Sequence, residues 1–203
     1  MHEQPYQFVL QFFENKKNLF FVDIGANDGV TWSNSLELER KLNWQGIAIE
    51  PHPTMFKQLI SNRQCKALNI AISNEENELD FFSIEGSWEA NMLSGLLNSY
   101  SEKHKDRVME EYKRYNGTAS VIKVKTHRLQ NILDENNVSK IDYLSIDTEG
   151  SEIPILESID FTKTNITLIS AEVNYDREPL DTLLGQYGYK FINKVACDAF
   201  YAR

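Results

Sequence analysis

The stretch FFVDIGANDGV, residues 20–30, decides the fold that the sequence predicts. It begins as a near-continuous apolar run, which is typical of a strand buried on both faces of a parallel sheet. It ends in small and polar residues with two glycines, Gly25 and Gly29, which adopt backbone angles closed to other residues. The stretch therefore predicts a buried strand, then a tight turn whose backbone a ligand can approach closely.

The rest of the chain alternates apolar runs with amphipathic segments of helical spacing, as parallel β-α-β units do. Strands are expected at 19–25, 45–51, 65–73, 140–147, 166–175, 189–195 and 198–203. Helices are expected at 31–44, 53–63, 128–137, 151–159 and 179–188. The last two strands are joined so closely that they can pair only antiparallel. The sequence predicts an α/β fold with a doubly wound, mostly parallel sheet that ends in an antiparallel strand.

Residues 83–120 break this rhythm with a loop and a long polar helix that a minimal doubly wound sheet does not need. Before them, 78–85 is expected to extend the sheet as an antiparallel strand. After them, 121–129 alternates apolar and polar residues and is expected to pair with that strand. We interpret 83–120 as a helical lid within one domain of residues 1–203, with the MLSGLL stretch at 92–97 as a hinge or lid that touches a cofactor.

Composition restricts the function. The chain is 41% hydrophobic and 25% charged, with a formal net charge of -9, which argues against binding nucleic acid or an anionic membrane. The two cysteines, Cys65 and Cys197, lie far apart and indicate neither a disulfide framework nor a zinc site. The first residues lack the pattern of a signal peptide, so we expect a cytoplasmic protein. Nothing in the sequence indicates the oligomeric state.

The spacing of the glycines in this loop argues against two common classes of phosphate-binding loop. A dinucleotide fingerprint begun at Gly25 requires glycines where this chain has Asn27 and Val30, and no phosphate-binding Gly-Lys-Ser/Thr triplet follows the strand. The remaining common ligand is a nucleoside with an amino-acid tail, whose ammonium group favours nearby carboxylates such as Asp23 and Asp28. The alternative is a tight turn between a strand and a helix with no ligand.

Glu50 ends the second expected strand, 21 residues after Gly29. An acidic side chain near this position accepts hydrogen bonds from ribose hydroxyls in nucleotide-binding folds. The alternative for Glu50 alone is an exposed strand end. Together the loop and Glu50 favour a nucleoside site.

Six short motifs follow one another along the chain. They are VDIGANDG (22–29), IEP (49–51), NIAIS (69–73), KVKTHRLQNIL (123–133), IDYLSIDTEGSEIPILES (141–158) and ISAEV (169–173). In these motifs the chain resembles the FkbM family of S-adenosylmethionine-dependent methyltransferases. The resemblance implies a class I methyltransferase (Rossmann-like) fold with seven strands, the last one antiparallel. It also implies methyl transfer to oxygen, often a hydroxyl group of a sugar or a secondary metabolite.

The resemblance also implies which residues bind S-adenosylmethionine. The methionine part is expected to contact residues of the first motif, and the ribose and adenine the next two motifs. The expected cofactor-binding residues are Asp23, Gly25, Ala26, Asn27 and Gly29 in the first motif, Glu50 and Pro51 in the second, Ala71 and Ile72 in the third, and Asp147.

Three carboxylates are the candidates for catalysis. A hydroxyl acceptor must lose its proton, so a general base within hydrogen-bond reach is expected. Asp147, Glu149 and Glu172 follow or end two later strands, and Asp147 is the first choice for base or cofactor clamp. Alternatively, Glu149 stabilises the start of a helix, Glu172 holds a loop, or the three residues bind a divalent cation.

The sequence therefore predicts an O-methyltransferase that acts on a hydroxyl group of a sugar, glycan or small metabolite. One alternative is a methyltransferase that acts on nucleic acid or protein. Against it stand the acidic balance and the lack of the Asn/Asp-Pro-Pro-Tyr/Phe element of nitrogen methyltransferases. Another alternative is a binding module that keeps the cofactor without turnover.

Overall fold

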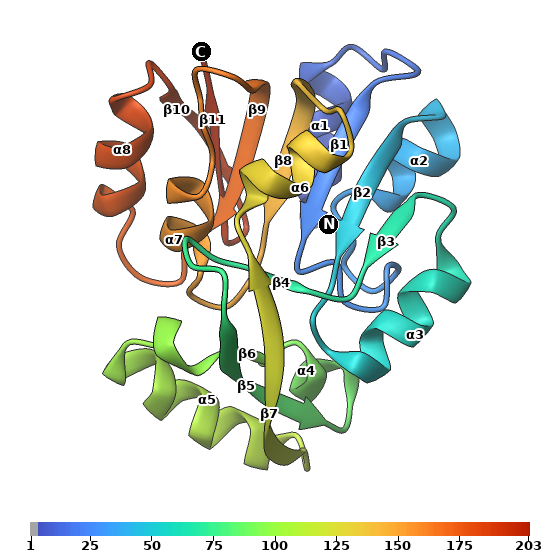
Figure 1. Cartoon of the computed structure of the whole chain (residues 1–203). Helices are drawn as coiled ribbons and strands as arrows, with labels where there is room; N and C mark the ends of the chain where they lie inside the picture. The colour runs from blue at the N-terminus through green and yellow to red at the C-terminus, as the bar shows by residue number, and fades with distance from the viewer. Residues whose placement is uncertain (1–3) are drawn as a thin grey trace.

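The computed structural model describes residues 4–203, and its larger sheet has the strand order β10-β11-β9-β8-β1-β2-β3 (Figure 1). Neighbouring strands run parallel through β1 (Phe20–Ile24), β2 (Gln45–Ile49), β3 (Lys66–Leu68), β8 (Lys140–Ile146) and β9 (Asn165–Glu172). The last strand, β11 (Asp198–Ala202), is antiparallel to both β9 and β10 (Lys190–Val195). The prediction of an α/β fold with an antiparallel final pair is confirmed.

Helices cover both faces of this sheet (Figure 1). On one face lie α1 (Pro5–Phe12), α2 (Leu36–Leu42) and α3 (Pro53–Asn62), and on the other α6 (Leu129–Glu135), α7 (Glu152–Glu157) and α8 (Glu178–Gly185). Because successive side chains of a strand point to opposite faces, Phe21 packs with α1 and α2, whereas Val22 packs with α6 and α7. No helix in residues 4–203 is long and apolar enough to span a membrane.

A second sheet has the order β4-β7-β5-β6 and includes β4 (Ala71–Ile72), β5 (Glu78–Glu85), β6 (Gly95–Leu96) and β7 (Thr118–His127). The predicted pairing of 78–85 with the later strand is confirmed, with Leu79 opposite Val124. The prediction that 78–85 extends the main sheet is wrong, because β5 belongs to this second sheet.

The single strand predicted for 65–73 is also wrong, because the chain leaves the main sheet after Leu68 and joins the second sheet at Ala71. Between them, the Asn69 side chain donates hydrogen bonds to the carbonyl oxygens of Glu50 (2.7 Å) and Pro51 (3.1 Å). These bonds hold the chain at the bend.

Residues 83–120 contain α4 (Trp88–Asn91), the short helix η1 (Leu97–Ser99) and α5 (Glu102–Arg114), the long helix that the sequence predicts. A buried cluster of Ile84, Tyr100 and Val108 joins α5 to the second sheet. In Figure 1 this sheet and α5 lie below the main sheet, on the side where β1, β2 and β8 end. The segment therefore lies beside the edge at which the motif residues emerge.

Candidate functional site

A cleft lies between the carboxyl ends of the parallel strands and the second sheet. It contains about 660 Å³ of empty space, part of it open to solvent. Gly25, Glu50 and Asp147 line it from the ends of β1, β2 and β8, whereas Phe81 and Leu96 line it from β5 and β6. Ligands bind outside the carboxyl ends of the strands in open α/β sheets, so the cleft is the candidate functional site.

Gly25 brings two of these strand ends together. Its φ angle is +85°, and a Cβ atom at this position would lie 1.7 Å from the carbonyl oxygen of Asp147. Its amide also donates to the carbonyl oxygen of Ile49, at 3.0 Å. Only glycine lets the first loop lie this close to the loop after β8.

Asn27 and Glu50 form a polar corner of the cleft. The Asn27 amide donates to Oε2 of Glu50 at 2.8 Å, and the His52 amide donates to Oε1 at 2.7 Å. Asn27 has a left-handed φ of 50°, and its side-chain Oδ1 is buried without a hydrogen-bond partner among residues 4–203. Burial raises the pKa of Glu50 to about 7, although both amide hydrogen bonds act in the opposite direction.

The remaining lining of the cleft is largely apolar. Pro51, Ala71 and Ile72, which the sequence predicts as cofactor residues, all line it. Met92 and Ser94 line it from the segment 92–97, which the sequence predicts as a lid that touches the cofactor. The sequence motifs did not predict several lining residues, namely Met55, Ile70, Phe81, Asn91, Thr148 and Ser151.

Three expected cofactor residues, Asp23, Ala26 and Gly29, are not among the residues that line the cleft. The Asp23 carboxylate is buried and accepts a hydrogen bond from the Ser35 hydroxyl. Ala26 is buried in an apolar cluster, and a Cβ atom on Gly29 would lie 2.7 Å from Arg63 Cγ. In this structure these residues stabilise the loop but do not line the cleft. The prediction differed because a sequence motif does not show which of its side chains point away from the ligand.

Asp147 and Glu172 form a pair of carboxyl groups at the ends of β8 and β9. Asp147 lines the cleft, and the Glu172 carboxyl group lies close enough to influence its pKa. Burial, followed by the negative charges of Glu152 and Asp23, raises the pKa of Asp147 to about 7. Burial and the neighbouring charge of Asp147 also raise the pKa of Glu172 well above its ordinary value. Near neutral pH the pair can therefore hold or accept a proton.

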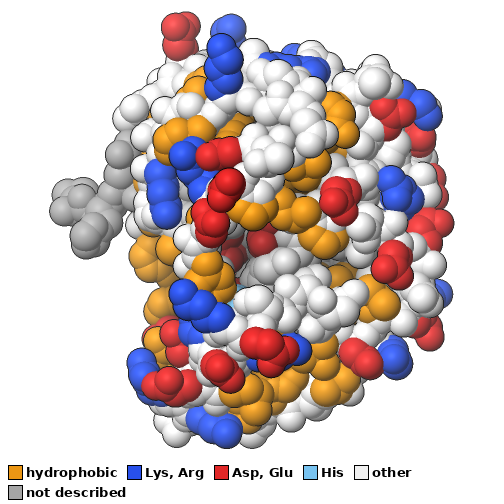
Figure 2. Space-filling model, turned by 90° about the vertical axis from the view of Figure 1, so that its left-hand side faces the viewer, with side chains coloured by type: hydrophobic (Ala, Val, Ile, Leu, Met, Phe, Trp, Pro, Cys, Tyr) orange, Lys and Arg blue, Asp and Glu red, His pale blue; other side chains and the backbone are white. Residues whose placement is uncertain are grey.

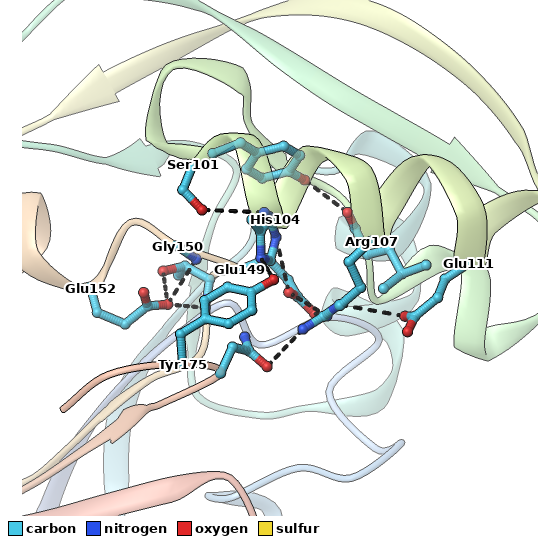
Figure 3. Close-up of polar contacts among 12 residues, drawn as sticks. Ser101, His104, Arg107, Glu111, Glu149, Gly150, Glu152 and Tyr175 are labelled. Carbon is cyan, nitrogen blue, oxygen red and sulfur yellow. Dashed lines mark hydrogen bonds and ion pairs between the residues drawn. The ribbon is translucent and has the colours of Figure 1, made fainter.

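Glu149 is held by side chains of α5 (Figure 3). Nη2 of Arg107 donates to both of its oxygens, at 2.9 and 3.1 Å, and Nη1 of Arg107 donates to the Asn174 side chain at 2.8 Å. Glu149 has a left-handed φ of 55°, a strained conformation for this residue type. Burial raises its pKa to about 8 against the opposing charge of Arg107.

His104 lies in α5, one turn before Arg107, and its ring packs against the Tyr100 ring. Its Nε2 lies 3.3 Å from Glu149 Oε2, and Tyr175 approaches its Nδ1 from the other side (Figure 3). Burial lowers the pKa of His104 to about 4, so the ring is neutral at pH 7. The sequence motifs predicted neither His104 nor Arg107 as a site residue. The only indication in the sequence was that the two residues are three positions apart, on one face of a predicted polar helix.

Asp147, Glu149 and Glu172, the residues of the divalent-cation alternative, do not form a metal-binding group in this structure. Within residues 4–203 it contains no group of three or more His, Cys, Asp or Glu side chains arranged to bind a metal ion. In particular, Glu149 is turned toward Arg107.

A family model of the methyltransferase FkbM domain matches residues 23–191, which is most of the chain. The chain belongs to the FkbM methyltransferase family. It is therefore an enzyme of the methyltransferase class, as its motifs predict.

Relatives of this FkbM chain agree with that assignment. Methyltransferase sdnD of Sordaria araneosa is 28% identical to it over 196 residues, which cover 85% of this chain and 74% of that protein. The crystal structure of methyltransferase FkbM from Methylobacillus flagellatus KT has a TM-score of 0.52 and 12% identity, over 93% of this chain and 44% of that one. This chain thus spans less than half the length of that structure.

Aeropyrum pernix fibrillarin, solved with natively bound S-adenosyl-L-methionine, also has a TM-score of 0.52, at 10% identity over 98% of this chain and 76% of that one. At such low identities, the likeness to both structures shows the shared fold of class I methyltransferases alone.

Proposed function

We propose that the protein transfers a methyl group from S-adenosylmethionine to a hydroxyl group of a sugar, glycan or small metabolite. The observation that carries this proposal is the buried Glu50 carboxylate beside Asn27, at the end of β2 in a cleft with apolar walls. When bound, S-adenosylmethionine supplies an electrophilic methyl group on a sulfonium centre.

The cleft residues fit this cofactor. Each Glu50 oxygen accepts one amide hydrogen bond and keeps a lone pair for a ribose hydroxyl. The unpartnered Oδ1 of Asn27 offers an acceptor to the ammonium group of the amino-acid tail. Ala71 and Ile72 provide apolar surface for the adenine ring. A buried acceptor without a donor is costly, so a ligand that donates to Asn27 gains free energy.

The carboxyl pair of Asp147 and Glu172 is suited to proton removal from the acceptor. A hydroxyl group becomes a good nucleophile when a base takes its proton, and a base works best when its pKa lies near the working pH. The pKa of Asp147, about 7, meets that condition. Glu149, held by Arg107, acts in this proposal as a positioning residue for the loop rather than as the base.

Residues 83–120 serve as the lid, since they contribute one wall of the cleft. The net charge of -9 favours a small-molecule or glycan acceptor over nucleic acid or a membrane surface. We place the reaction in the cytoplasm.

Calorimetric titration with S-adenosylmethionine and S-adenosylhomocysteine tests the proposed function. The wild-type protein is expected to bind both, and Glu50→Ala to weaken binding by about 1–3 kcal/mol through loss of the ribose hydrogen bonds. Glu135→Ala, which removes an exposed carboxylate on α6, is the matched control and should leave affinity unchanged. Failure of the folded wild-type protein to bind either compound would refute the proposal. Binding without methyl transfer to any acceptor of a broad panel would favour the non-catalytic module.

A further inference from the structure

A second pocket lies on the side of the molecule where the start of α5 faces the loop after β9. It contains about 650 Å³ of empty space, part of it open to solvent. Figure 2 views this side and shows a hollow with acidic side chains around it. The residues that line the pocket come from η1 and α5, the start of α7, the end of β9 and the start of α8.

The second pocket and the cofactor cleft share a wall. Glu149 and Ser151 line the cleft, while Gly150 and Glu152, in the same turn, line the second pocket. The carboxyl pair spans this wall, because Asp147 lines the cleft and the neighbouring Glu172 lines the second pocket. The two cavities therefore meet at the groups that are suited to proton removal.

Two buried polar atoms of this pocket lack a hydrogen-bond partner in the described chain, Oε2 of Glu172 and Nε2 of His104. His104 Nε2 lies near Glu149 without making a hydrogen bond. A buried polar atom left unpaired costs about 1–3 kcal/mol. A ligand hydroxyl that donates to Glu172 would recover part of that cost, so the pocket is suited to a hydrogen-bond donor.

When they are ionised, the acidic side chains of the second pocket disfavour an anionic ligand. Glu152, Glu172 and Asp176 line it. The nearby cations are already engaged, Arg107 with Glu149 and Lys103 with the ring of Tyr175 at 4.5 Å. Between the acidic groups lie apolar surfaces of Ile153, Val173 and Leu180 and the Tyr175 ring. Such a lining suits an uncharged molecule with hydroxyl groups on an apolar frame.

We propose that this second pocket is the acceptor subsite, and that it binds an uncharged, hydroxylated molecule through hydrogen bonds to Glu172 and contact with the Tyr175 ring. The assignment rests on the proposed function and adds to it where the acceptor lies and which charge it carries. Tyr175 is 42% exposed, so its ring is available to a ligand.

Saturation-transfer NMR tests the assignment with defined probes, a set of neutral methyl hexopyranosides and the matching hexuronates, each with and without S-adenosylhomocysteine. Neutral glycosides are expected to bind at least tenfold more tightly than the uronates. Glu172→Gln and Tyr175→Ala should each weaken neutral-glycoside binding about tenfold or more, the effect of losing about 1.4 kcal/mol. Tyr175→Ala should keep the wild-type affinity for S-adenosylhomocysteine, measured by calorimetry.

Tyr187→Ala is the matched control, because Tyr187 is similarly exposed (39%) but lines a different surface beside Phe161. It should not change glycoside binding. The assignment is overturned if no neutral glycoside binds, if uronates bind as tightly, or if Tyr175→Ala binds as wild type does. If the wild-type protein fails to bind S-adenosylhomocysteine, the proposed function fails as well. Normal cofactor binding with any of the first three outcomes overturns the acceptor subsite alone.

Discussion

Glu50 is a carboxylate placed where ionisation is costly. It is 6% exposed, and two backbone amides donate to it, yet burial still raises its pKa to about 7. A ribose that donates two further hydrogen bonds would favour the charged form and lower this pKa. Binding of the nucleoside and ionisation of Glu50 are therefore coupled.

This coupling predicts that affinity for S-adenosylhomocysteine rises with pH up to about 7 and then levels off. Below that pH the free protein holds a proton on Glu50 that binding must release, which costs up to about tenfold in affinity per pH unit. Calorimetry between pH 5.5 and 8 measures the profile. Glu50→Gln should bind S-adenosylhomocysteine more weakly, and its affinity should depend less on pH. We assign any pH dependence that remains in this variant to Asp147. A profile that Glu50→Gln leaves unchanged would contradict the role of Glu50.

Gly25 lets the ends of β1 and β8 lie close together. Gly25→Ala places a Cβ atom 1.7 Å from Asp147 O at a φ of +85°, so the two strand ends must move apart. We expect a loss of at least about 1–3 kcal/mol in the free energy of unfolding and loss of cofactor binding. Gly185→Ala is the control, because a Cβ atom there meets nothing within 4 Å and alanine favours the helix. Urea denaturation that gave both variants equal stability would contradict this account.

Among the elements, α5 contacts the loops after β8 and β9 through Arg107. Its guanidinium bridges Glu149 and Asn174, and its side chain is only 27% exposed. Arg107→Ala leaves the Glu149 carboxyl group buried without its cation, and hydrogen bonds to charged groups contribute about 1.5–3 kcal/mol. The expected result is faster amide hydrogen exchange throughout Glu102–Arg114, with the main sheet unchanged.

Arg114→Ala is the matched control for this helix. Arg114 pairs with Glu110 on the surface, with side chains 61% and 72% exposed, and such pairs contribute little to stability. It should leave exchange in α5 within experimental error. Equal exchange in Arg107→Ala and the wild-type protein would show that α5 is held by its apolar face alone.

The elements also show what sequence patterns can predict. Apolar runs predicted the strands, and amphipathic segments of helical spacing predicted the helices. The alternation of apolar and polar residues in the later strand predicted the pairing of β5 with β7. These patterns did not indicate which sheet β5 joins, because that depends on the bend at Asn69, which side-chain hydrogen bonds to the preceding loop stabilise. Strand pattern specifies local conformation, whereas sheet membership depends on contacts distant in sequence.

The sequence also predicted part of the lining of the cleft. Gly25, Asn27, Glu50 and Asp147 line the cleft because parallel strands end at one edge, which the strand pattern already implies. Arg107 was missed because its role depends on how α5 packs on the core, which helical spacing does not specify.

Across the whole molecule, buried carboxyl groups gather at the carboxyl edge of the main sheet. Burial raises the pKa of each, to about 7 for Glu50 and Asp147 and about 8 for Glu149. The same direction holds for Asp23, Glu152, Glu172 and Asp198. The folded protein therefore holds protons that the unfolded chain releases near pH 4.

Because the folded state binds more protons, the free energy of unfolding is predicted to fall as pH rises from about 5 to 8. The slope is up to about 1.4 kcal/mol per pH unit for each group protonated only in the folded state. His52 and His104, whose pKa values are lowered, act in the opposite direction only below about pH 6.5. Urea titrations at pH 7 and 8 isolate the carboxyl groups, and Glu172→Gln should flatten the dependence. Stability that is constant or rises between these pH values would contradict the prediction.

A crystal structure of the protein with S-adenosylhomocysteine tests the central claim most directly. We predict the nucleoside in the cleft between the two sheets, with its ribose hydroxyls about 2.5–3.0 Å from the Glu50 carboxylate and its amino-acid tail beside Asn27. A nucleoside bound elsewhere, or a ribose without contact to Glu50, would contradict it.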